Sequence, residues 1–197
     1  MPTSRAQSMR TLNLICAVMG SAYFSRCPSE NRFVTLIWGI EAFHRTKHHD
    51  SSSDKIKSKV CRIIEQVRDS KDKSWLKGML KHAHEPRLEQ RIFDVLTAIP
   101  INIDSTKIRE FADECAERRN EMSHFGAQRD GRHYTDVIRD LEKKSAALSI
   151  LYHMLILHEI GIDEKILNWW IYEGFRSYRI KRTLVEVGLL DKSVLEP

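Results

Sequence analysis

The stretch from Tyr134 to Ile160 carries apolar side chains at the spacing of an α-helix over roughly seven turns. A heptad stripe runs along it, formed by Val137, Leu141, Ser145, Leu148, Tyr152 and Leu155. Its second half is apolar nearly all round, because four more apolar residues are added there: Leu151, Met154, Ile156 and Leu157. A helix of this kind needs other elements around it. We expect it at the centre of a helical bundle or at a subunit interface.

The rest of the chain shows the same period, and no stretch has the alternating pattern of a strand. No glycine-rich phosphate loop and no internal repeat is present. The sequence therefore predicts an all-α, up-and-down bundle of about six to eight helices. The expected organisation is an N-terminal helix in 1–27, a helical bundle in 28–172, and a C-terminal helical extension in 173–197 that packs on the same domain.

Composition favours a soluble protein with an anionic partner, since 32 basic residues exceed 27 acidic ones in a chain of 197 residues, a net charge of +5. The four cysteines lie far apart with no C-x-x-C pair, so neither a zinc site nor a disulfide framework is indicated. Residues 9–22 imitate a short signal peptide, but Asn13 interrupts their apolar run. Nothing approaches the roughly 20 apolar residues of a membrane span. We expect a cytoplasmic protein without a membrane partner.

One charged residue stands out in the helix predicted from about Asp104. Arg119 falls on the apolar stripe of that helix, whose other members are Ile108, Phe111, Ala112, Cys115 and Met122. An unpaired charge on a buried face costs several kcal/mol, so an arginine there needs a partner. His124 follows five residues later, and Gly126 is a plausible C-terminal cap. Taken alone, the pair is weak evidence of a site, because such pairs also occur by chance.

The residues around this pair resemble a known family. Arg119-Asn120, then three residues and His124, resemble the R-N-x-x-x-H signature of HEPN-domain ribonucleases. The segment from Arg32 to Arg45 resembles an early helix of the Apea-like HEPN branch, and the helix ending at 158–162 resembles the closing helix of the family. The resemblance covers roughly Ser29 to Ile171. It implies a HEPN-like bundle that cleaves RNA.

The two motif residues suit RNA cleavage without a metal or other cofactor. RNA carries its own nucleophile, the 2′-hydroxyl beside each phosphate, so cleavage needs a base, an acid and charge stabilisation. His124 titrates near neutrality and can move the proton. Arg119 offers several donors to the charge that develops on the phosphorus centre. DNA lacks the 2′-hydroxyl and would be spared.

Helix geometry separates the two side chains. Five residues turn a regular helix by roughly 500°, which leaves Arg119 and His124 about 140° apart and about 7.5 Å apart along the axis. Either the helix distorts before His124 or a second chain completes the site. The resemblance implies the second case, a two-fold homodimer with a composite active site in which both motifs meet.

Three neighbours have supporting roles in this interpretation. Glu41 matches an acidic position of the early family helix, and we expect it to pair with Arg119 across the bundle because both intrude on apolar stripes. Asn120 matches the polar residue after the arginine; it either orients the helix end or contacts phosphate, or it faces water. The Ser123 hydroxyl is expected to bond the helix backbone rather than act as a nucleophile.

Basic residues elsewhere are candidate RNA contacts. Arg118 adjoins the motif, Lys55 and Lys59 lie on a basic helix that begins at Asp54, and Arg176 and Arg179 alternate with aromatic residues near the C-terminus. Ordinary solvated helix faces explain the last two groups equally simply.

Two groups of histidines invite a metal assignment: His44, His48 and His49 in one, and His82 and His84 in the other. No H-E-x-x-H pattern accompanies them, and they lie among charged residues at expected helix ends. We predict no metal site.

The leading interpretation is a metal-independent HEPN endoribonuclease that acts as a toxin or an antiviral defence effector. Its partners would be RNA, a second copy of the chain, and an antitoxin or a regulatory N-terminal region. The alternative is a catalytically silent HEPN-like dimer that serves as a binding or toxin–antitoxin partner module. A DNA-binding helical protein ranks last, because the basic helix from Lys55 follows a serine-rich linker rather than a short turn.

Overall fold

The structure is a computed structural model that describes residues 29–47, 54–125 and 133–196, without the side chains of His124 and Phe125. Within these ranges the chain forms eight α-helices and one 3-10 helix, and no strand. The all-α prediction is therefore confirmed. The helix predicted in 1–27 and the cap predicted at Gly126 lie outside the described residues.

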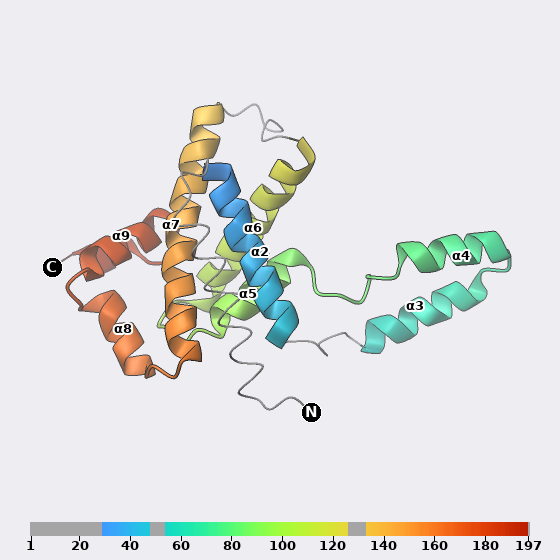
Figure 1. Ribbon diagram of the computed structural model, residues 1–197, viewed down its shortest axis with the longest axis horizontal. Coiled ribbons are helices and arrows are strands. Elements are labelled where there is room, and N and C mark those ends of the chain that lie inside the picture. The colour runs from blue at the N-terminus through green and yellow to red at the C-terminus, as the bar shows by residue number, and fades with distance from the viewer. Residues whose placement is uncertain (1–28, 48–53, 126–132, 197) are drawn as a thin grey trace. The chain divides into compact units, whose positions relative to one another are not determined.

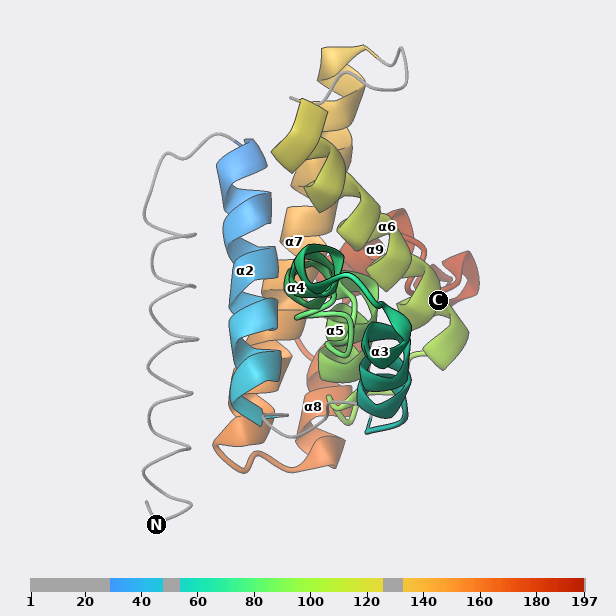
Figure 2. The same cartoon turned by 90° about the vertical axis from the view of Figure 1, so that its right-hand side faces the viewer.

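The chain divides into two compact units: residues 45–87 form one, and the remainder forms the other. The larger unit contains most of α2 (Ser29–Lys47), followed by α5 (Leu88–Thr97), α6 (Ser105–Phe125), α7 (Tyr134–Glu159), α8 (Glu164–Tyr172), α9 (Ser177–Glu186) and the 3-10 helix η1 (Lys192–Leu195). In this unit α5 packs on α6, while α9 packs on α7, α8 and η1. Figures 1 and 2 both show α2 beside α7.

The core of the larger unit follows the apolar stripes of the sequence. All six members of the heptad stripe of α7 are buried. In α2 the apolar face formed by Phe33, Leu36, Ile37 and Ile40 is fully buried. Tyr152 of α7 donates a hydrogen bond of 2.7 Å to the Leu36 carbonyl of α2, and burial raises the pKa of its phenol. These contacts fix α2 against α7.

Helices α7 and α9 end in the same way, in a Schellman motif. Gly161 after α7 and Gly188 after α9 have positive φ angles of 90° and 79°. After α9, the amide of Gly188 donates to the Val185 carbonyl and the next amide donates to the Leu184 carbonyl. A glycine is needed because other residues rarely adopt this left-handed conformation.

The smaller unit is a hairpin of α3 (Asp54–Gln66) and α4 (Ser70–Met79), which pack on each other (Figure 1). Asp69 caps α4, accepting hydrogen bonds from the amides of Lys71 and Asp72 at 2.8 and 2.9 Å. Apolar residues follow helical spacing in α3 at Ile56, Val60, Ile63 and Ile64, but neither helix contains a buried residue. The hairpin therefore has no closed core of its own.

Candidate functional site

A single carboxylate joins three helices of the larger unit. Oε2 of Glu41 in α2 lies 3.5 Å from Nη2 of Arg119 in α6. Its other oxygen, Oε1, lies 3.2 Å from Nη1 of Arg91 in α5. The predicted pairing of Glu41 with Arg119 is confirmed, and Glu41 bridges two guanidinium groups.

The contact with Glu41 holds Arg119 in place but does not use all of its N–H donors. About a quarter of its side chain is exposed, at 26%. Its Nη1 donates to the side-chain oxygen of Asn120 at 3.3 Å, and its buried Nε has no hydrogen-bond partner among the described residues. A guanidinium has five N–H donors. Arg119 therefore has donors left for an anion that reaches it, whereas Asn120 itself is exposed.

Arg91 is a member of this cluster that the sequence analysis did not single out. It is almost fully buried, with 6% of its surface exposed. A signal was present, because Arg91 lies three residues after Leu88 and four before Val95, on the apolar stripe of α5. The argument that selected Arg119 applies equally to Arg91.

His124 lies near the end of the helix that carries Arg119. The backbone of α6 is helical without a break through Phe125, so α6 does not end before His124. The side chain of His124 lies outside the described residues. Ser123 donates from Oγ to the Arg119 carbonyl at 2.9 Å, which confirms its expected bond to the helix backbone.

Comparison with known families bears directly on this site. The profile of the Apea-like HEPN family matches residues 34–166, which include Glu41, Arg91, Arg119 and His124. The chain belongs to the Apea-like HEPN family. Neither the curated proteins nor the solved structures give a significant match. HEPN proteins include ribonucleases and toxin or defence proteins.

A second polar cluster of this HEPN chain lies between α2, α5 and α6. The buried ring of His44 pairs with Asp94, with 3.2 Å between Nε2 and Oδ2. Asp94 also accepts from Gln90 at 2.5 Å, and Gln90 accepts from Arg109 at 3.0 Å. The guanidinium of Arg109 also lies 3.4 Å above the centre of the Phe93 ring. This chain of contacts fixes α5 against both α2 and α6, beside Glu41.

The described parts of the chain contain no group of three His, Cys, Asp or Glu side chains placed to hold a metal ion. His44 is buried against Asp94, and His82 contacts Glu85 at 2.5 Å. His48 and His49 lie outside the described residues. No described helix is long and apolar enough to cross a membrane.

Arg118, beside the motif arginine, belongs to an ion-pair network between α6 and α7. Its Nε lies 2.9 Å from Asp140, and its Nη1 lies 2.6 Å from Glu121. Asp140 also pairs with Lys144 at 2.5 Å, and Lys144 reaches Glu114 at 3.0 Å. An RNA phosphate would have to compete with two carboxylates for Arg118. Contact between Arg118 and RNA therefore stays a prediction.

This network shifts the pKa values of its members. Burial alone would raise the pKa of Asp140, but hydrogen bonds and charge from Lys144 and Arg118 hold it below its usual value. Burial alone would lower the pKa of Lys144, but Asp140 and Glu114 hold it above its usual value. Asp140 and Lys144 therefore both stay charged at neutral pH.

The other predicted RNA contacts lie elsewhere in the chain. Lys55 and Lys59 are exposed on α3, in the smaller unit. Arg176 and Arg179 are exposed at the start of α9, beside the exposed aromatic rings of Phe175 and Tyr178. All four cations are accessible, and their RNA contacts stay predictions.

Proposed function

We propose that this HEPN protein is a metal-independent endoribonuclease. The observation that carries the proposal is the Arg119 guanidinium, which Glu41 holds at 3.5 Å while about a quarter of the side chain stays exposed and each Nη atom has, in the described part of the chain, one contact for its two N–H groups. A guanidinium that is fixed in place yet keeps free donors suits the charge of a phosphoryl transition state. His124, five residues further along α6, supplies the group that moves protons.

The reaction that fits these residues uses the substrate's own nucleophile. His124 would take the proton from a 2′-hydroxyl, whose oxygen attacks the adjacent phosphorus. Arg119 would stabilise the extra negative charge on the phosphate oxygens. A second imidazole would protonate the leaving 5′-oxygen. The products would be a 2′,3′-cyclic phosphate and a 5′-hydroxyl.

The second imidazole would come from a partner subunit. Because α6 continues through His124 without a break, a regular helix directs Arg119 and His124 about 140° apart. A two-fold dimer would bring two copies of each residue to one cleft. We therefore propose a homodimer with a composite active site, in which Asn120 contacts the phosphate or orients the end of the helix.

The biological role that we propose is that of a toxin or an antiviral defence effector, controlled by an antitoxin or a regulatory N-terminal region. Its support is the membership in a superfamily with such roles. Cleavage of cellular or viral RNA into fragments with 2′,3′-cyclic phosphate and 5′-hydroxyl ends would be the effector reaction.

Cleavage of labelled total RNA in excess EDTA tests the proposal. Wild-type protein is compared with Arg119→Ala and His124→Ala, and with Arg139→Ala as a matched control that removes an exposed arginine of α7. We expect wild type and Arg139→Ala to leave cyclic-phosphate ends, and the two motif variants to lose at least about a hundredfold in rate. If the folded wild type leaves every RNA intact, the silent binding module becomes the better interpretation.

A further inference from the structure

The positive charge of the chain is concentrated in the smaller unit. Residues 45–87 contain 12 Lys and Arg and 6 Asp and Glu, a net charge of +6. All other residues together contain 20 basic and 21 acidic side chains, a net charge of −1. The excess that favours an anionic partner is thus a property of the α3–α4 hairpin and not of the unit that holds Arg119.

We propose that the α3–α4 hairpin, residues 54–79, is an RNA-binding arm that holds the phosphate backbone of the substrate independently of the cleavage site. The choice of RNA as the polyanion rests on the proposed function. The binding itself rests on the charges and grooves of the hairpin.

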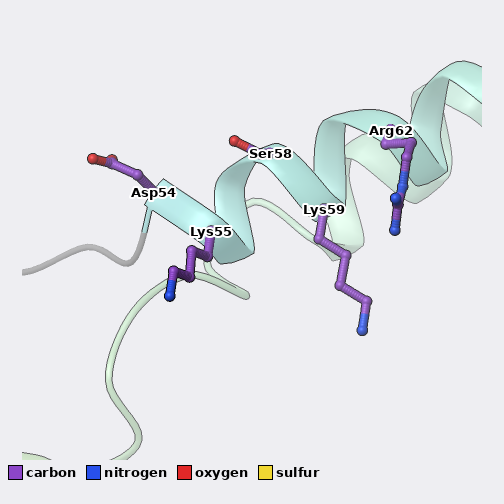
Figure 3. A pocket seen from close by; sticks show the side chains of 5 residues that line it. All are labelled: Asp54, Lys55, Ser58, Lys59 and Arg62. Carbon is purple, nitrogen blue, oxygen red and sulfur yellow. The ribbon is translucent and has the colours of Figure 1, made fainter.

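Three of the four cations of α3 are free to bind an external anion, whereas Lys57 lies 3.9 Å from Asp54. Lys55, Lys59 and Arg62 extend to one side of the helix (Figure 3). Each is exposed, and none forms an ion pair with any residue that the structure describes. In the larger unit Arg91, Arg118 and Lys144 are paired with carboxylates, while Arg176 and Arg179 are exposed, as these three cations are. Lys55, Lys59 and Arg62 follow each other by about 6 and 4.5 Å along the helix axis, which suits successive phosphates.

Two open grooves on the hairpin are lined by cations and hydroxyls. One, of about 500 Å³, lies along α3 and is lined by Asp54, Lys55, Ser58, Lys59 and Arg62. The other, of about 450 Å³, lies between the helices, and its lining includes Ile64 and Glu65 of α3 and Ser70, Lys73, Ser74 and Lys77 of α4. Lysine and serine side chains are common donors to phosphate oxygens.

A basic amphipathic helix can also bind an anionic membrane surface. Membrane binding needs an apolar face that is free to enter the lipid. Here Val60 and Ile64 are partly buried and α3 packs on α4, while Ile56 and Ile63 are exposed, so the apolar face of α3 is partly covered. The cations instead line grooves with hydroxyl groups, which favours phosphate groups in a flexible chain.

The test measures binding of a fluorescent single-stranded RNA of about 16 nucleotides by anisotropy over a range of salt concentrations. The full chain carries Arg119→Ala so that the RNA stays intact. One variant adds Lys55→Gln, Lys59→Gln and Arg62→Gln. The matched control adds Lys143→Gln, Lys165→Gln and Lys192→Gln, which removes the same charge from exposed positions of the larger unit. Circular dichroism and thermal unfolding check the fold of each.

We expect the hairpin variant to lose at least tenfold in affinity, and the slope of log K against log salt to fall by about 2. The control should keep most of its affinity and slope. Equal losses in the hairpin and control variants would overturn the proposal, since net charge alone would then explain binding.

The same proteins separate this proposal from the ribonuclease proposal. For cleavage, the three hairpin substitutions are also made in the chain that keeps Arg119. If wild type cleaves RNA, and the hairpin substitutions change neither binding nor cleavage, the arm proposal is overturned and the nuclease proposal stands. If RNA binding depends on the cations of the hairpin but wild type does not cleave RNA, the arm proposal is supported and the ribonuclease proposal is overturned. Binding to phosphatidylcholine vesicles with added phosphatidylserine, without binding to RNA, would overturn the arm in favour of a membrane surface.

Discussion

Glu41 and Arg119 form an ion pair that joins α2 to α6, with 3.5 Å between Oε2 and Nη2. The same carboxylate binds the buried Arg91 through its other oxygen at 3.2 Å. Arg91 thus fixes the carboxylate, and the carboxylate fixes the guanidinium of the motif. We infer that Glu41 is a positioning residue for Arg119, and that Arg91 acts through Glu41.

Glu41→Gln tests this positioning. The neutral amide keeps the shape but loses the charge that orients Arg119, so we expect the maximal cleavage rate to fall by roughly ten- to a hundredfold with little change in KM. The free energy of unfolding should fall by roughly 2–3 kcal/mol, because the buried Arg91 loses its counter-charge. Single-turnover cleavage and urea unfolding measure the two effects. Asp140→Asn is the control, since it also removes a carboxylate between two cations but does not touch Arg119. Equal losses of cleavage rate in Glu41→Gln and Asp140→Asn would mean that Glu41 only stabilises the fold.

Arg91→Met separates the two arginines that share Glu41. Methionine fills the buried site, and Arg119 remains as the partner of Glu41, so no carboxylate is left alone. We expect a loss of roughly 1–2 kcal/mol in stability and a cleavage rate within about threefold of wild type. Arg119→Met, by contrast, should abolish cleavage. A loss of activity in Arg91→Met as deep as in Arg119→Met would show that Arg91 itself contacts substrate.

The sequence predicted those parts of the molecule that depend on local spacing. The period of α6 and α7 predicted both helices and their buried faces, and one charge on an apolar stripe predicted the pair of Glu41 and Arg119. The network of Arg118, Asp140 and Lys144 was not predicted, because it depends on how α6 is rotated against α7. The stripe of α3 predicted a helix correctly, but periodicity does not say whether a stripe finds a partner, and α3 buries no residue.

Gly188→Ala isolates a backbone effect far from the motif in the chain. At a φ of 79° alanine is strained, although no atom lies within 4 Å of the added Cβ. We expect about 1 kcal/mol of destabilisation from the left-handed backbone alone, with cleavage unchanged. Gly161→Ala after α7 should cost a similar amount for the same reason. Gly78→Ala is the control, because Gly78 lies inside α4 with open space around it and alanine favours the helix. Thermal unfolding of the three variants checks the contrast, which fails if all three shift equally.

Asp140 should account for part of the fall in the free energy of unfolding at acid pH. Its pKa is lowered in the folded state by Lys144 and Arg118, so its contribution is complete above the unfolded value near 3.8 and is lost as the pH falls through the lowered folded value. Asp140→Asn lacks this contribution. We expect the variant to be roughly 2 kcal/mol less stable at neutral pH, and the gap to wild type to close as the pH falls from 5 towards 2.

The raised pKa of Lys144 should cause a corresponding fall in the free energy of unfolding at alkaline pH. Its contribution is complete below the unfolded value of 10.5 and is lost as the pH rises through the raised folded value. Asp140→Asn weakens this contribution as well, because it removes one of the two carboxylates that bind Lys144. Urea unfolding followed by circular dichroism between pH 2 and pH 11 measures both effects, with the exposed Asp136→Asn as the matched control on the same helix. A gap between Asp140→Asn and wild type that stays constant down to pH 2 would mean that the carboxylate of Asp140 contributes through packing and not through its charge.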